Sequence, residues 1–431
     1  MWTARKAEGF PQVGAAEPQV VTDRAAGNLD KPEFNSPNGG VPIKSGEVTP
    51  PLQLCHCQMA KRKRQIANYV RIWAGVTEGA AKNLESLEGA MEWSILRTLA
   101  LVCLSLLIPL LMAAQTEPSP SRGLLLVANK GNQTLGIVDP VAGLELAEVP
   151  EGGITGHEVA ASPEGQTAYV PIYGNSGVGR PGTDGRTMAV IDLASHRVLR
   201  TLDFDQPLRP HCAVFGPKNG LLYVTTELAN SITVIDPKSL RIVSSIPTGQ
   251  RESHMLAITH DGERGYTANV GPGTVSAIDL AAQKTLAIIP ISRQTQRIAL
   301  SVDDRWAFTA DQTAPRLAVI DTSTNKVQTW IKLPTVAYGT APTLDGRWLL
   351  ITLPAANKIG VLDLESMKIA RLVEVDKMPQ EILVRPDGQV AYVSCMASGK
   401  IAAVNLKTWK VEQLISAGPQ ADGLAWAPQN P

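Results

Sequence analysis

Residues 211–246 read HCAVFGPKNGLLYVTTELANSITVIDPKSLRIVSSI, and this stretch decides the fold. Four short runs rich in apolar and β-branched residues occupy positions 211–215, 221–225, 231–235 and 241–246. Gly, Pro, Asn and Asp separate these runs. Short apolar runs bounded by turn residues are typical of β-strands joined by tight turns. The stretch therefore predicts one unit of four antiparallel strands.

The same unit recurs along the chain at intervals of about 42 residues. Its clearest marker is an apolar residue followed by Asp or Asn at the end of the third strand. The marker occurs at Val138-Asp139, Ile191-Asp192, Ile235-Asp236, Ile278-Asp279, Ile320-Asp321, Leu362-Asp363 and Val404-Asn405. A repeated four-strand unit of this length is a propeller blade.

The two ends of the repeat are incomplete in complementary ways. The chain enters at residues 124–127 with a second strand that has no first strand before it. It ends at residues 422–427 with a first strand that has no second strand after it. One blade is thus completed by both ends, which removes the exposed edges of an open sheet stack. We predict an all-β, seven-bladed β-propeller over residues 123–431, closed by its C-terminal strand.

The second strands carry a recognisable motif, and on it the chain resembles the YVTN-repeat propellers of bacterial and archaeal surface layers. The motif-like segments are Tyr169-Val170, Tyr223-Val224-Thr225-Thr226, Tyr266-Thr267-Ala268-Asn269 and Tyr392-Val393-Ser394. The resemblance covers residues 123–431 and implies the propeller fold. It guides function less, because the family includes binding, adhesion and enzyme-like propellers.

The residues before the propeller read as a leader. Residues 1–90 lack a sustained apolar period and predict disorder. Residues 91–115 have the layout of a signal peptide, with an apolar run from Thr98 to Met112, and residues 116–122 form a linker. Either Met91 is the true start and residues 1–90 are a mis-annotated segment, or residues 95–112 are an uncleaved signal anchor.

Both interpretations place residues after Gln115 outside the cytoplasm. We therefore expect an exported protein that is periplasmic, secreted or on the cell surface, and that touches a membrane only through an uncleaved anchor. The 40 basic and 40 acidic residues balance, which argues against a nucleic-acid partner. Cys212 and Cys395 fall in distant blades and predict no disulfide. Cys55-His56-Cys57 lacks a second pair of zinc ligands, so we expect no zinc site there. We expect the protein to be a monomer.

A candidate binding site follows from the repeat. In propellers, the start of each first strand and the loop after each second strand lie on one face, at the mouth of the central channel. The seven first-strand starts are all polar: His157, His211, His254, Arg297, Tyr338, Gln380 and Asp422. Glu227, with Glu158, Asp311 and Glu381, is expected near the same face. These residues predict a ligand site at the channel mouth.

Three of the propeller's five histidines, His157, His211 and His254, share one repeat position in consecutive blades. Three imidazoles on one rim suggest a site for Cu, Zn or Fe, or acid–base groups that act near neutral pH. The alternative is that the repeat inherited a structural histidine. Metal binding at these three residues is therefore one expectation, and a structural role is the other.

The second blade is about ten residues longer than the others, and the extra residues lie between its second and third strands. This loop, residues 174–186, contains five glycines. Long loops in compact domains are often functional, so it is a candidate lid over the channel mouth. A tolerated surface insertion is the alternative.

Three functional hypotheses follow from these features. The first is an exported propeller that binds a small molecule, or a protein or cell-surface partner, at the channel mouth. The second is a metal-dependent propeller enzyme, of oxidoreductase or lyase/lactonase type, that uses the three histidines. The third is a structural surface or adhesion protein.

Overall fold

The computed structural model describes residues 122–175 and 177–429. The chain divides into two units, Met1–Leu111 and Met112–Pro431, and all described residues belong to the second. The predicted disordered segment, the signal segment 91–115 and Cys55-His56-Cys57 lie outside the described residues. No helix within the described part of the chain is long and apolar enough to span a membrane.

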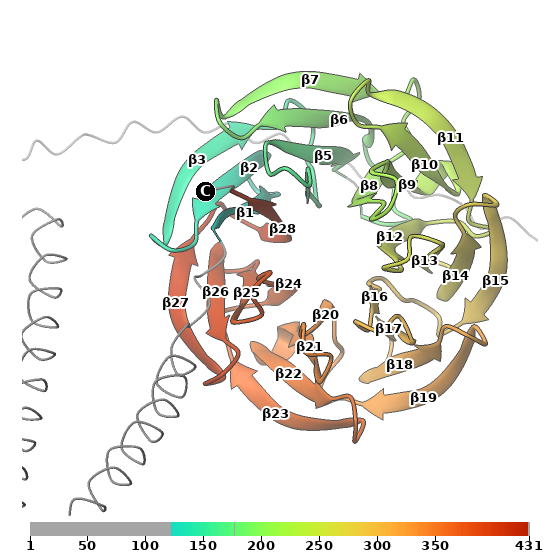
Figure 1. Cartoon of the computed structure of the whole chain (residues 1–431), viewed down its shortest axis with the longest axis vertical. Helices are drawn as coiled ribbons and strands as arrows, with labels where there is room; N and C mark the ends of the chain where they lie inside the picture. The colour runs from blue at the N-terminus through green and yellow to red at the C-terminus, as the bar shows by residue number, and fades with distance from the viewer. Residues whose placement is uncertain (1–121, 176, 430–431) are drawn as a thin grey trace, which may run out of the picture. The chain divides into compact units, whose positions relative to one another are not determined.

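The described residues form seven antiparallel sheets of four strands each, arranged in a ring (Figure 1). This arrangement confirms the predicted all-β, seven-bladed propeller. In each blade we call the strands inner, second, third and outer, counting from the axis of the ring. Six blades use four strands that are consecutive in the chain.

The blades, each written from its inner to its outer strand, have the following bounds. Blade 1 contains β28 (Ala421–Pro428), β1 (Gly123–Asn129), β2 (Thr134–Asp139) and β3 (Leu144–Pro150). Blade 2 contains β4 (Ala160–Ala161), β5 (Thr167–Gly174), β6 (Asp184–Asp192) and β7 (Arg197–Asp203). Blade 3 contains β8 (Pro210–Phe215), β9 (Leu222–Thr226), β10 (Ser231–Asp236) and β11 (Arg241–Pro247). Blade 4 contains β12 (Ser253–Ile258), β13 (Arg264–Asn269), β14 (Thr274–Asp279) and β15 (Lys284–Pro290).

The remaining three blades follow the same order. Blade 5 contains β16 (Ala299–Leu300), β17 (Trp306–Ala310), β18 (Arg316–Asp321) and β19 (Lys326–Lys332). Blade 6 contains β20 (Thr340–Pro342), β21 (Trp348–Leu353), β22 (Lys358–Asp363) and β23 (Lys368–Glu374). Blade 7 contains β24 (Pro379–Val384), β25 (Val390–Cys395), β26 (Lys400–Asn405) and β27 (Lys410–Ser416). Two single-turn 3₁₀ helices, η1 (Glu227–Ala229) and η2 (Pro354–Ala356), follow second strands.

The ring closes as predicted, because β28 pairs with β1 in blade 1. Leu125 lies opposite Trp426, and Val127 lies opposite Leu424. The last strand of the chain is therefore the inner strand of the blade that the first strand begins.

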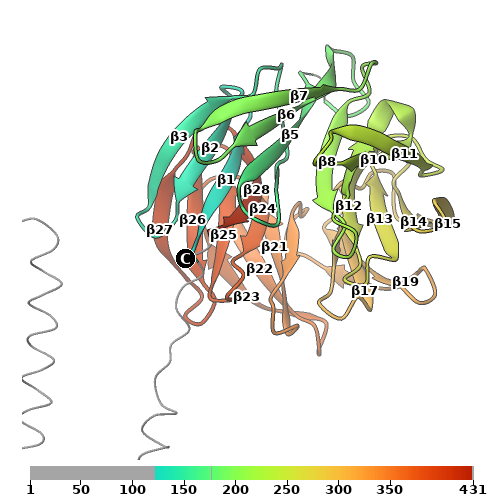
Figure 2. The ribbon, with the colours of Figure 1, turned by 45° about the horizontal axis from the view of Figure 1, so that its top comes forward.

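Burial explains why the strands differ in sequence. The middle strands pack against neighbouring blades on both faces, and all five residues of β9 are buried. Strands covered on both faces read as continuous runs of apolar and β-branched residues. The outer strands, such as β3, β7 and β11, lie on the outside of the ring (Figure 2). In β27 exposed residues alternate with less exposed ones, as expected for a strand with one face in water.

The apolar-Asp marker has a structural role in the turn between third and outer strands. In blade 3, the pairing register shifts between Val234 and Ile235, which marks a β-bulge. Asp236 then accepts hydrogen bonds from the Lys238 amide (3.0 Å) and the Ser239 hydroxyl (2.7 Å). A short carboxylate that bonds the backbone two residues later is a strong turn former. The marker therefore reports blade architecture and not a functional site.

The register also defines one face of the ring. The start of an inner strand pairs with the end of its second strand, as in Pro210 with Thr226 and Pro379 with Cys395. Inner-strand starts and the loops after second strands therefore lie together on what we call the upper face. The predicted loop 174–186 is shorter than expected, because Gly174 ends β5 and residues 184–186 begin β6.

Candidate functional site

The three predicted histidines come together on the upper face. The His211 and His254 rings are stacked, with centroids 3.6 Å apart, and the His157 ring lies edge-on to His211 at 5.4 Å. Tyr173, at the end of β5, packs against all three rings with centroid distances of 4.7, 5.1 and 5.9 Å. We call His157, Tyr173, His211, Glu227 and His254 the histidine cluster.

Burial keeps two of these imidazoles neutral. His211 is 1% exposed, and burial together with the neighbouring His254 and His157 holds its pKa well below the usual value. Burial, with a contribution from Lys130, lowers the pKa of His157 to about 3. A neutral imidazole offers one N–H donor and one acceptor nitrogen. The cluster therefore presents hydrogen-bonding groups without positive charge at these two residues.

The predicted metal site gains no support from this geometry. No group of three or more His, Cys, Asp or Glu side chains within residues 122–175 and 177–429 is arranged to hold a metal ion. The three histidines nevertheless share one cluster. Binding of Cu, Zn or Fe at His157, His211 and His254 stays a prediction.

A hydrogen-bonded chain runs through Glu227 and His254. The Tyr173 hydroxyl donates to Glu227 Oε2 at 2.7 Å, and His254 Nδ1 bonds Glu227 Oε1. On the other side of the His254 imidazole, Gln296 Nε2 lies 3.3 Å from His254 Nε2 and 2.9 Å from the Tyr338 hydroxyl. The chain thus joins blades 2 to 6 across the upper face.

Arg297 organises a second group, which we call the arginine cluster and which also contains Lys130, Glu158, Glu381 and Asp422. The Arg297 guanidinium contacts Glu381, and its Nη2 lies 2.9 Å from Glu158 Oε1 and 3.2 Å from Asp422 Oδ1. Lys130 Nζ lies 3.0 Å from Asp422 Oδ2. The Tyr338 ring, 4.9 Å from the guanidinium carbon, connects this cluster to the histidine cluster through Gln296.

The three carboxyl groups around Arg297 do not behave alike. Burial raises the pKa of Glu158 to about 8, although Arg297 acts in the opposite direction. Burial also raises the pKa of Glu381. At Asp422 burial is outweighed by Lys130 and Arg297, which lower its pKa. Near neutral pH, Glu158 is therefore largely protonated while Asp422 is ionised.

Two predicted residues take no part in either cluster or in the Tyr338 connection between them. Gln380 is buried, but its side-chain amide donates to the carbonyl of Pro379 at 3.3 Å, and its neighbour Glu381 reaches Arg297 instead. Asp311 bonds Thr313 and Arg316, whose Nε lies 2.8 Å away. Both side chains are held by residues near them in the chain.

Three residues of the site were missed from the sequence: Lys130 and Tyr173, which belong to the clusters, and Gln296, which connects them. A repeat signal for the first two exists. In blades 1 to 3, one second-strand residue lies opposite the third-strand residue just before the β-bulge: Leu126, Tyr169 and Tyr223. Four positions later in the chain come Lys130, Tyr173 and Glu227. Gln296 directly precedes Arg297 but has no marker of its own.

The long loop of blade 2 is attached to the same face. Arg209 Nε lies 2.6 Å from Asp184 Oδ1, and its Nη2 donates to the carbonyl of Arg180 at 2.8 Å. The guanidinium carbon also lies 5.8 Å from the centre of the Tyr173 ring. The loop base is therefore linked to the histidine cluster, while the proposed lid movement stays a prediction.

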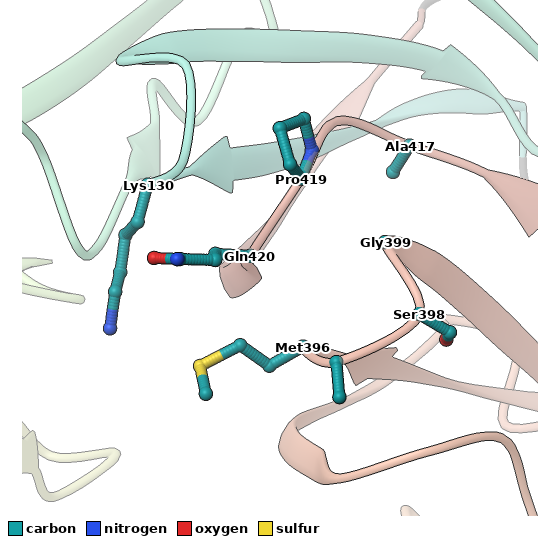
Figure 3. A pocket seen from close by; sticks show the side chains of 8 residues that line it. Lys130, Met396, Ser398, Gly399, Ala417, Pro419 and Gln420 are labelled. Atoms are coloured by element: carbon teal, nitrogen blue, oxygen red, sulfur yellow. The ribbon is translucent and has the colours of Figure 1, made fainter. Parts of the chain in front are cut away.

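A pocket of about 680 Å³ opens on the upper face beside the arginine cluster (Figure 3). Gln420 points toward Lys130 in this view, and Lys130 also bonds Asp422. The pocket therefore borders the arginine cluster at Lys130. Its lining consists of Lys130, Met396, Ala397, Ser398, Gly399, Ala417, Pro419 and Gln420.

Fold and site together define a seven-bladed β-propeller with a buried polar centre on one face. No family model matches the chain, and no curated protein matches its sequence. The YVTN-repeat family thus stays a prediction.

Solved structures share the fold. Kuenenia stuttgartiensis hydrazine synthase has a TM-score of 0.57 at 18% identity, covering 68% of this chain and 96% of that chain. A functionally unknown protein from Desulfotomaculum acetoxidans has a TM-score of 0.60 at 11% identity, covering 72% and 100%. The periplasmic gluconolactonase PpgL of Pseudomonas aeruginosa has a TM-score of 0.57 at 18% identity, covering 71% and 99%. At these identities the likeness shows the propeller fold alone.

Proposed function

We propose that this chain is an exported propeller that binds a small polar molecule at the histidine cluster. The observation that carries the proposal is the state of His211. The residue is 1% exposed, and its Nδ1 has no hydrogen-bond partner among the described residues. An unmet buried hydrogen bond costs about 1–3 kcal/mol. A ligand hydroxyl or carbonyl that bonds this nitrogen recovers that free energy.

The charges favour an uncharged ligand that is rich in hydroxyl groups. Arg297 and Lys130 are already paired with Asp422, and Arg209 is paired with Asp184. An anionic ligand would therefore have to displace an existing ion pair. Neutral imidazoles and carboxyl groups instead suit the donors and acceptors of a sugar-like molecule.

One of the similar solved structures supports the proposed sugar-like ligand by analogy. Gluconolactonase is named for a sugar lactone, and its fold is that of this chain. The competing hypotheses, a three-histidine metal enzyme and a structural surface protein, have no comparable observation in their favour. Each predicts a different outcome for the experiment below.

The test is isothermal titration calorimetry of the full chain with D-glucose and D-gluconate as probes. We expect the uncharged sugar to bind more tightly than the anion, and His211→Gln to weaken binding at least tenfold. His260→Gln is the matched control, because His260 is exposed and bonds Asp304 on the opposite face. Absence of binding by both probes would contradict the proposal.

Metal analysis of the same preparation separates the second hypothesis. Stoichiometric Cu, Zn or Fe that disappears in the His211 variant would favour the metal enzyme. Assembly into a lattice without ligand would favour the structural protein. For export, the expected result is a mature protein outside the cytoplasm with an N-terminus near Gln115, and a cytoplasmic protein retaining Met91 would contradict it.

A further inference from the structure

The hydrogen bonds of His254 fix the position of its proton. An ionised carboxylate only accepts hydrogen bonds, so the bond between Nδ1 and Glu227 places the proton on Nδ1. An amide NH₂ only donates, so Gln296 Nε2, 3.3 Å away, donates to a lone pair on His254 Nε2. His254 Nε2 is therefore an acceptor that faces Gln296.

Glu227 is itself held in place. It is 1% exposed, and its second oxygen accepts the Tyr173 hydroxyl at 2.7 Å. A buried carboxylate that bonds one imidazole nitrogen orients the ring and makes the other nitrogen a better base. Tyr173 and Glu227 thus act as positioning residues for His254.

The side-chain amide of Gln296 lies between the His254 imidazole, which can act as a base, and the Tyr338 hydroxyl, which can donate a hydrogen bond. Its Nε2 lies within hydrogen-bond distance of both His254 Nε2 and the Tyr338 hydroxyl oxygen, which it reaches at 2.9 Å. Tyr338 accepts this bond, so its own O–H remains a donor. Burial raises the pKa of Tyr338 and keeps it protonated. Gln296 is only partly buried. Catalysis at this point requires its side chain to rotate and admit a substrate oxygen and a water molecule.

The nucleophilic side chains near His254 make hydrogen bonds within the fold and are not available for catalysis. Cys212 contacts the carbonyl of Leu256 at 3.8 Å, and burial raises its pKa to about 12. The Thr225 hydroxyl donates to the carbonyl of His254 at 2.8 Å. A thiolate is the reactive form of cysteine, so Cys212 is a poor nucleophile. Water is the nucleophile that this site can use.

We infer that the histidine cluster hydrolyses a lactone of a hydroxylated acid, with His254 as the general base, and this inference rests on the proposed binding function. His254 Nε2 takes a proton from water, and the water oxygen bonds the lactone carbonyl carbon. Tyr338 donates to the carbonyl oxygen as it becomes negative. The ring C–O bond then breaks, its electron pair stays on the ring oxygen, and that oxygen takes the proton from His254.

The substrate class follows from the charges. A lactone is uncharged and enters a site whose cations are already paired. Its product is a hydroxy acid, whose carboxylate finds no unpaired cation in the described part of either cluster. The site therefore favours the substrate over the product, which promotes release.

The test is proton release from D-glucono-1,5-lactone and δ-valerolactone, followed with a pH indicator on the full chain. We expect hydrolysis above the uncatalysed rate, with kcat/KM lowered at least 100-fold in His254→Gln and about tenfold in Glu227→Gln. The loss in Glu227→Gln should appear in kcat with little change in KM, as expected for a residue that positions the base. His260→Gln should retain full activity, and circular dichroism should show that each variant is folded.

Three results would overturn the inference. Hydrolysis of neither lactone above the uncatalysed rate, in a protein that binds D-glucose, would reject catalysis and leave the binding proposal standing. Full activity of His254→Gln would reject His254 as the base. Absence of both hydrolysis and D-glucose binding would reject both proposals.

Discussion

Leu126 of β1 lies opposite Ala425 of β28, so the first and last strands of the propeller are neighbours in one sheet. The apolar residues of β28 are buried in this closure, with Ala427 fully buried and Leu424 8% exposed. The stability of the whole ring therefore depends on β28, the C-terminal strand.

This closure predicts a large effect of a small change in β28. Leu424→Ala removes a buried side chain next to Val127 and should lower the free energy of unfolding by about 2–5 kcal/mol. Val141→Ala, at an exposed position, should change it by less than about 0.5 kcal/mol. Urea unfolding measures both. Truncation after Gly418 should prevent stable folding, and equal stability of the truncated and intact chains would contradict the closure.

The propeller could be predicted from the sequence because its signals are local. The Asp236 marker forms its turn through bonds within three residues, and the same chemistry recurs at each turn. The middle strands are covered on both faces, so they read as apolar runs. The boundaries of each blade can therefore be recognised from its own sequence, and all seven repeats indicate the same propeller fold.

The site was only partly predictable because its partners come from different blades. His157, His211 and His254 share a repeat position, and their proximity follows from the ring. On β24 both Gln380 and Glu381 are predicted near the site, and the side chain that reaches Arg297 is that of Glu381. The register of β24 shifts between Pro379 and Ile382. β8 has the same shift between Pro210 and Ala213, yet its His211 lies in the histidine cluster, so strand register alone does not determine which side chain joins the site.

His211 should make the protein less stable in acid. Its native pKa lies well below the value of about 6.5 for an unfolded histidine, so below that pH the unfolded chain binds more protons than the native one. Stability contributed by this residue is present above about pH 6.5 and is lost as the pH falls. At pH 5 the loss is about 2 kcal/mol.

The measurement compares unfolding free energies at pH 7 and pH 5. In His211→Gln the difference between the two pH values should be smaller than in the wild type by about 2 kcal/mol. His260→Gln removes an exposed imidazole and should retain most of the wild-type difference. An unchanged pH dependence in His211→Gln would show that the residue is protonated in the native state.

Arg297 should be essential for stability near neutral pH. Arg297→Met leaves the ionised Asp422 without this cation and removes the hydrogen-bonding partner of Glu158 and Glu381, and breaking a buried ion pair costs about 3–5 kcal/mol. The cost should fall in acid, because the carboxyl groups can then take up protons. Urea unfolding at pH 7 and pH 5 measures both effects.

Arg186 provides the control for this variant. It pairs with Asp203 at 2.8 Å, but both side chains are about half exposed. Exposed ion pairs contribute at most about 1 kcal/mol, so Arg186→Met should have a small effect at either pH. Similar losses for the two variants would mean that the arginine cluster does not depend on Arg297.

Arg209 should hold the blade 2 loop against the upper face. Its guanidinium bonds Asp184 and the carbonyl of Arg180 at the same time, from a side chain that is 6% exposed. Lysine has a single nitrogen and cannot reproduce this fork, so Arg209→Lys should lose one bond. The loss is about 1.4 kcal/mol, which corresponds to about tenfold faster hydrogen exchange in residues 177–183. Arg200→Lys, which changes an exposed arginine on β7, should leave exchange in this loop unchanged. Equal exchange rates in the Arg209 variant and the wild type would show that Arg209 does not hold the loop.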